Sequence, residues 1–192
     1  MLTQLHHIIS SVMQEVYYMR ESEAIVLVVD APALMTSEGR WHNAVNAPLL
    51  ITTLFKELNL DEKRKLVLLV PVKCETYARQ EADQIKLVEA VREAYAPLLN
   101  FLHQHDKVTV AITPVQTLGN AILNSVSESA DGPKFNFRKT RIDAPYAPQD
   151  TEQPLAYILS FFIKLHLNER RGFWDKFNDY LFASDKPFRD AV

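Results

Sequence analysis

An unbroken apolar run at residues 66–70, LVLLV, is the feature that most constrains how this chain folds. The run ends at Pro71 and is followed by the polar residues Lys73 and Glu75. A continuous apolar run bounded by a breaker is typical of a strand buried on both faces, as in a parallel sheet covered by helices. Ligands of such sheets bind just beyond the carboxyl ends of the strands. The sequence therefore predicts a candidate site at Lys73 and Glu75.

Two further apolar runs rich in β-branched residues predict strands, at 24–29 and 108–112. Apolar residues recur at helical spacing in three other segments, 2–20, 48–58 and 85–102. We expect Asn46 to cap the second of these helices, Pro97 to kink the third, and 31–45 to form a loop. Alternating helices and strands predict a three-layer α/β domain with a mainly parallel sheet flanked by helices.

The pattern changes after Gly119. Residues 121–126 and 134–140 flank an Asp131-Gly132 turn signal and predict an added β-hairpin. An extended connection at 144–153 leads to a helix with inward apolar residues up to 167, capped by Asp150 or Thr151. We therefore predict an α/β domain over 1–168 and an aromatic-rich helical tail over 169–192.

Composition narrows the class of protein. The chain has 192 residues with 47% apolar content, which is enough for one domain with its own core. Its formal net charge of -3 gives no electrostatic reason to expect nucleic acid as a partner. The amino terminus lacks the features of a signal peptide, Leu155 to Leu167 is too short for a membrane span, and Cys74 is the single cysteine. We therefore expect a cytoplasmic protein that does not bind membranes.

The three strand ends, read together, resemble a known family. VLVVDAP at 26–32, LVPVKCETY at 69–77 and ITPVQTLG at 112–119 are similar to the second half of a Ras-like (TRAFAC-type) P-loop GTPase domain. More narrowly, they resemble divergent GTPase-like proteins of bacterial conflict or defence loci. The segment YAPQDTEQPLAYILSFFIK at 146–164 resembles the entry into the last helix of those proteins. The likeness extends over about residues 10–168 and depends on the order and spacing of several motifs.

The resemblance implies a guanine-binding role for two loops. The family's Asn-Lys-x-Asp motif would fall on residues 72–75, where Lys73 and Glu75 keep the lysine and the acid but Val72 replaces the asparagine. Thr113, Pro114 and Val115 would form the loop that contacts the base through its backbone. GTP is the ligand implied, and the sequence identifies no other cofactor and no metal site.

The phosphate-binding half of such a site is missing from the pattern. A GxxxxGK[ST] loop supplies backbone donors and a lysine for the phosphates, and the chain's four glycines do not fit it. We therefore expect a degenerate, non-catalytic interaction or regulatory module. It would bind a protein partner or itself through an exposed sheet edge. The alternative is a GTP-binding subunit or fragment, and a GTP hydrolase only if the loop comes from upstream or from another chain.

Each candidate residue also has a simpler structural interpretation. Lys73 and Glu75 would be a solvated pair in a loop at a helix start, and Asp30 would cap the loop after its strand. Cys74 would be a packed thiol, although Asp30, Lys73 and Cys74 also suggest an isochorismatase-type Asp–Lys–Cys hydrolase. His103 and His105 would be surface residues, since a zinc site needs more ligands than these two.

Overall fold

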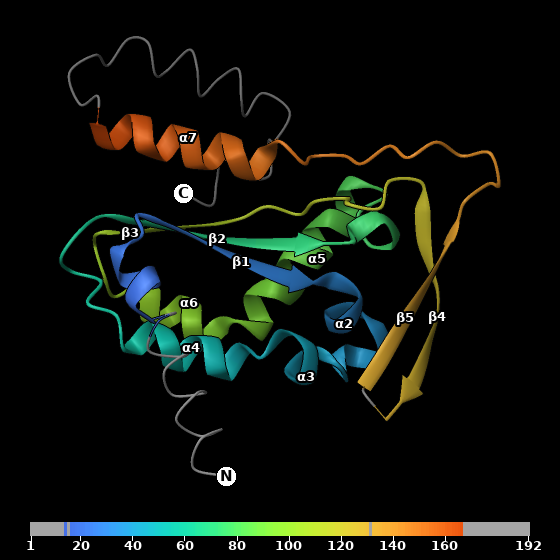
Figure 1. Cartoon of the computed structure of the whole chain (residues 1–192), viewed down its shortest axis with the longest axis horizontal. Helices are drawn as coiled ribbons and strands as arrows, with labels where there is room; N and C mark the ends of the chain where they lie inside the picture. Colours follow the sequence, from blue (N-terminus) through green and yellow to red (C-terminus); the bar gives the residue numbers. More distant parts are fainter. Residues whose placement is uncertain (1–13, 15, 131, 167–192) are drawn as a thin grey trace.

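The computed structural model describes residues 14, 16–130 and 132–166, and a parallel sheet lies at its centre (Figure 1). The strands β1 (Ala24–Asp30), β2 (Lys65–Val72) and β3 (Val108–Ile112) run parallel in the order β1-β2-β3. The middle strand β2 is buried from its first residue through Pro71. The predicted α/β class and the strand assigned to 66–70 are therefore confirmed.

Helices cover the two faces of the sheet unequally. Because both crossovers carry the chain in the same direction along the sheet, right-handed connections place their helices on one face. Figure 1 shows these helices together beneath the sheet, and among the described helices α7 (Gln153–His166) is the one above it. The helices of the larger layer are α2 (Ala31–Met35), α3 (His42–Asn46), α4 (Pro48–Lys56), α5 (Glu81–Ala94) and α6 (Ala96–Leu102).

Side chains on the two faces of the sheet form two separate hydrophobic cores. The larger core joins Val29, Val67 and Leu69 to the layer of α2–α6. The smaller core consists of Leu66, Leu68, Val70 and Val115, against which residues of α7 pack: Tyr157, Ile158 and Phe161. The alternation of β2 side chains between these cores explains why its sequence shows no polar face.

The helices agree with the sequence at Pro97 and differ from it in two places. The chain breaks at Tyr95 between α5 and α6, with Pro97 in the first turn of α6, so the predicted kink is confirmed. The expected loop at 31–45 is instead α2, a 3-10 turn (Thr36–Gly39) and most of α3. Asn46 does not cap α4, because Ala47 occupies that position and the Asn46 side chain bonds to β1.

The predicted hairpin is confirmed. Strands β4 (Ala121–Ser129) and β5 (Gly132–Lys139) pair antiparallel, with a bulge between Leu123 and Ser125. The hairpin stands beside the sheet and is tied to the 3-10 turn Cys74–Thr76, because the Leu123 N–H donates to Thr76 Oγ1 at 2.9 Å. No helix in the part of the chain described here is both long and apolar enough to cross a membrane.

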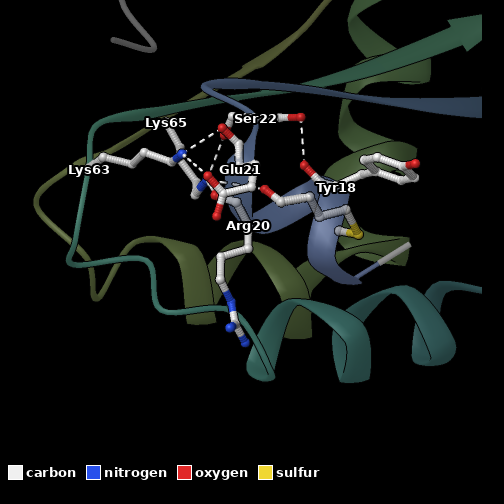
Figure 2. Close-up of polar contacts among 7 residues, drawn as sticks. Tyr18, Arg20, Glu21, Ser22, Lys63 and Lys65 are labelled. Carbon is white, nitrogen blue, oxygen red and sulfur yellow. Dashed lines mark hydrogen bonds and ion pairs between the residues drawn. The ribbon is translucent and has the colours of Figure 1, made fainter. Parts of the chain in front are cut away.

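A buried lysine fixes the helical segment that precedes β1. Residues 16–21 are helical, and the predicted helix before residue 16 lies almost entirely outside the described residues, as does the aromatic tail at 169–192. Figure 2 shows Lys65 at the centre of this contact. Its Nζ donates to the carbonyl oxygens of Met19 at 3.1 Å, Arg20 at 2.7 Å and Ser22 at 2.6 Å. Lys65 therefore satisfies carbonyls that the end of a helix leaves without partners.

Candidate functional site

Lys73 and Asp30 meet at the carboxyl edge of the sheet. Lys73 follows β2 with a left-handed backbone conformation (φ 59°), and Asp30 is the last residue of β1. The Lys73 Nζ lies 2.5 Å from Asp30 Oδ2, and the side chains are 35% and 13% exposed. The parallel pairing of β1 and β2 brings both residues to this edge, so the lysine is paired within the chain.

Asp30 also organises the chain that leaves β1. Its Oδ1 accepts a hydrogen bond from the Ala33 N–H at 2.9 Å, which confirms the predicted cap. The Asn46 side chain contacts the backbone of the same residue: the Asp30 N–H donates to Asn46 Oδ1 at 2.8 Å, and Asn46 Nδ2 donates to the Asp30 carbonyl at 3.2 Å. The amide of Asn46 thus takes the place that a neighbouring strand would have at the end of β1.

A buried histidine lies behind this amide. Asn46 Nδ2 lies 3.0 Å from His42 Nδ1, and because that nitrogen of Asn46 is a donor, His42 Nδ1 is the acceptor. The imidazole is therefore neutral, with its proton on Nε2. Burial lowers the pKa of His42, which favours the same neutral form. The His42 ring meets Tyr95 edge to face, with centroids 5.4 Å apart, and burial raises the pKa of Tyr95 to about 12.

Glu75 is buried and holds a loop rather than facing solvent. Its side chain is 5% exposed, and its Oε1 accepts hydrogen bonds from the N–H groups of Leu118 and, at 2.9 Å, Gly119. Gly119 has φ +66°, and a Cβ there would lie 2.6 Å from the backbone of Ala147, so this loop requires glycine. Glu75 is therefore not part of a solvated pair. It also lies outside α5, which begins only at Glu81.

The loop expected to contact a base lies at the same edge. Val115 bridges to Val72, and its N–H donates to the Pro71 carbonyl at 2.8 Å. Thr113 and Val115 are buried at 5% and 4% exposure. The structure thus gathers Lys73, Glu75, Thr113, Pro114 and Val115 around the end of β2, although their side chains do not converge on one open cavity.

A small pocket lies next to this loop. It encloses about 20 Å³, which is room for about one water molecule. Burial raises the pKa of Asp150 in its wall, and Gln153 Oε1 has no hydrogen-bond partner among the described residues. The residues that line it are Ala78, Gln84, Thr113, Pro114, Gln116, Asp150 and Gln153. A purine ring does not fit this volume.

Cys74 is a packed thiol, as the simpler interpretation predicts. It is fully buried, and its Sγ donates to the Pro71 carbonyl at 3.1 Å. Burial raises the pKa of Cys74 to about 12, so the thiolate needed by a nucleophile does not form near neutral pH. Asp30 and Lys73 do meet as an Asp–Lys–Cys hydrolase would require, but the third member of that triad points into the core.

Histidine and carboxylate groups elsewhere do not assemble into a metal centre. His105 Nδ1 lies 3.0 Å from Asp61 Oδ1 near the amino edge of the sheet, whereas His103 is exposed. Within residues 14, 16–130 and 132–166, no group of three or more His, Cys, Asp or Glu side chains is placed to bind a metal ion.

The topology also bears on ligand binding. Open α/β sheets bind ligands in the crevice where the strand order reverses. The described sheet runs β1-β2-β3 without such a reversal, so its carboxyl edge carries polar residues but no crevice formed in that way. At this edge, polar side chains such as Asn46 and Glu75 bind backbone groups of neighbouring segments instead.

Sequence reasoning missed the contribution of Asn46 and His42. Their sequence signal is an i, i+4 spacing of two polar residues, of which His42 lies in the expected loop and Asn46 at the expected cap. Comparisons with known proteins do not add to the site: no family model matches the chain, and searches of curated proteins and of solved structures found no match. The functional conclusion therefore depends on the geometry.

Proposed function

We propose that this chain is a non-catalytic, GTPase-like module that acts by binding another protein or a second copy of itself. The observation that carries the proposal is the internal pairing of the side chains that the resemblance assigns to guanine. Lys73 is bound by the Asp30 carboxylate, and Glu75 Oε1 is bound by two backbone N–H groups. Neither side chain is presented to a ligand.

Releasing these groups for a nucleotide would cost free energy. If Glu75 turned toward a base, the partly buried N–H groups of Leu118 and Gly119 would lose their acceptor, at up to about 1–3 kcal/mol for each. Lys73 would in turn leave the Asp30 carboxylate without its cation. Binding of the guanine ring alone, without the phosphate contacts of a Gly-rich loop, would have to supply more free energy than these two losses. Interaction through a surface is the function that this arrangement favours.

The surface that supports an interaction role is the open edge of the sheet. β1 pairs with β2 on one side only, and within the described residues no strand pairs with its other side. Val26 and Val28 on this strand are 42% and 61% exposed. Natural proteins usually cover, charge or interrupt such an edge, whereas AIVLVV contains no charge and no proline.

Calorimetric titration of the purified chain with GTP and Mg²⁺ tests the proposal. We expect no saturable binding tighter than about 1 mM, which corresponds to roughly 4 kcal/mol. The same titration of Glu75→Gln and of the exposed control Glu89→Gln should give identical traces. Magnesium-dependent micromolar binding that is lost in Glu75→Gln and kept in Glu89→Gln would overturn it.

A second candidate is a nucleotide-binding subunit whose phosphate-binding loop comes from another polypeptide. The observation in its favour is that Lys73, Glu75 and the loop 113–115 lie at one edge, as the resemblance requires. Guanosine tests the base pocket without phosphate: binding should release Glu75 and shift the Leu118 and Gly119 amide resonances, while adenosine should not. Unchanged resonances with both nucleosides would exclude this candidate.

A further inference from the structure

Three alternate residues of β1 direct backbone N–H and C=O groups away from β2 without a partner among the described residues. In a strand, the backbone N–H and C=O of successive residues point alternately to opposite sides. The Glu23 carbonyl accepts from the Leu66 N–H, so residues 23, 25, 27 and 29 direct these groups toward β2. Ala24, Val26, Val28 and Asp30 therefore direct theirs to the open edge.

Asn46 closes one end of this edge. Its side-chain amide occupies both the N–H and the C=O of Asp30. Ala24, Val26 and Val28 have no such partner among the described residues. The open set is thus symmetric about Val26, with one residue on either side of it along the edge. An identical strand running antiparallel, with its own Val26 opposite, would satisfy every open group on both chains.

We propose that two copies of this chain pair antiparallel through β1, about a two-fold axis at Val26, to form one continuous sheet. This inference rests on the interaction role proposed above and identifies a second copy as the partner. Val26 faces Val26 of the second copy, and Val28 faces its Ala24. Each pair exchanges two N–H···O bonds, because both of its residues direct their backbone groups to the shared edge.

The side chains on this edge favour the same pairing. Val26 and Val28 lie on the face of the sheet that carries Leu68 and Val70, beyond the cover of α7. Pairing would bring the exposed valines of both copies into one apolar patch and remove part of their surface from water. The antiparallel register places Asp30 opposite Ser22 of the second copy, whereas a parallel in-register pair would set Asp30 against Asp30.

Lysine and glutamate substitutions at Val26 test both the surface and the register. In analytical ultracentrifugation, the wild-type chain should sediment as a dimer. Val26→Lys should sediment as a monomer or dimerise about tenfold more weakly, because like charges meet on the axis. Val26→Glu should behave in the same way. An equimolar mixture of the two variants should dimerise again, since only a register with residue 26 opposite residue 26 pairs the new charges.

Val45→Lys is the matched control, because Val45 has the same residue type and the same 42% exposure but lies on α3. It should remain a dimer. A monomeric wild-type chain at its highest soluble concentration, or a Val26→Lys variant that stays dimeric, would overturn the inference. Circular dichroism of each variant confirms folding. Failure of the dimer leaves the nucleotide titration unaffected, and nucleotide binding leaves the sedimentation result unaffected, so the two proposals fail separately.

Discussion

Two lysines at opposite ends of β2 differ in their burial and in the groups that bind their charge. Lys65 at the amino end is fully buried, and its Nζ donates to three backbone carbonyls of the preceding segment (Figure 2). Lys73, just past the carboxyl end, is 35% exposed and contacts one carboxylate, Asp30. The first ammonium is enclosed by backbone that cannot move independently of the fold. The second is held by the Asp30 side chain, which also caps α2 through the Ala33 N–H.

The two lysines differ in how much of the fold depends on their charge. Burial lowers the pKa of Lys65, yet three carbonyl acceptors surround its charge, so any loss of that charge disturbs a helix end. Lys73 is partly exposed, so its own charge is solvated when it leaves Asp30, and the cost falls on the 13% exposed Asp30 carboxylate, which loses its cation. The amino end of β2 therefore holds a lysine enclosed by backbone, whereas the carboxyl end holds a partly solvated lysine whose carboxylate partner is the more buried group.

The largest expected effect comes from removing the buried charge. Lys65→Met keeps the length of the side chain but leaves the carbonyls of Met19, Arg20 and Ser22 without their donor. We expect a loss of about 3 kcal/mol in the free energy of unfolding, measured by urea denaturation. Lys63→Met is the control, since Lys63 contacts Glu21 at the surface; it should cost less than about 1 kcal/mol. Equal losses in the two variants would show that Lys65 contributes no more than a surface lysine at the same end of β2.

A smaller effect is expected at the other end of the strand. Lys73→Met and Asp30→Asn should each cost about 1 kcal/mol, and the double variant should reveal a coupling of about 0.5–1 kcal/mol in a double-mutant cycle. Asp30→Asn retains an oxygen for the Ala33 N–H, so the cap survives and the ion pair alone is lost. A coupling above about 3 kcal/mol would show that the carboxyl end is as rigid as the amino end.

The smallest effect concerns pH at the carboxyl end. Because burial holds the pKa of His42 below its ordinary value near 6.5, the unfolded chain binds a proton more readily than the folded one. The stability contributed by neutral His42 is complete above about pH 6.5 and is lost progressively as the pH falls below it. Thermal unfolding at about pH 7, 6 and 5 measures the slope of stability against pH.

His42→Gln should flatten that slope, because an amide oxygen can accept from Asn46 and does not titrate. His103→Gln removes an exposed histidine and should leave the slope as it is in the wild type. If the slope survives in His42→Gln, groups other than His42 control the pH response, and the buried chain from His42 through Asn46 to Asp30 is not its source.

The sequence could predict those elements that a few consecutive residues determine. The strands follow from short apolar runs, the break at Tyr95 from Pro97, and the hairpin from its turn residues. Cys74 is a packed thiol inside the core, as its simpler interpretation predicted. These features depend on a few consecutive residues, so a single sequence is sufficient to identify them.

The candidate site depends on contacts between distant segments, which the same reasoning could not supply. Asn46 looks like a helix cap in the sequence, but its amide is taken by the backbone of Asp30, sixteen positions earlier. Glu75 is expected in solvent and instead binds the N–H groups of Leu118 and Gly119. In each case a short polar side chain has several possible partners, and strand pairing decides which one is near.

The unequal cover of the sheet has a consequence for synthesis of the chain. The larger core consists of segments up to β3, so it can assemble once the chain through Ile112 has left the ribosome. The other face, with Leu66, Leu68 and Val70, waits for α7, which the ribosome adds only after the β4–β5 hairpin. During that interval the nascent domain carries a bare apolar surface, and this is the stage at which chaperones would bind it.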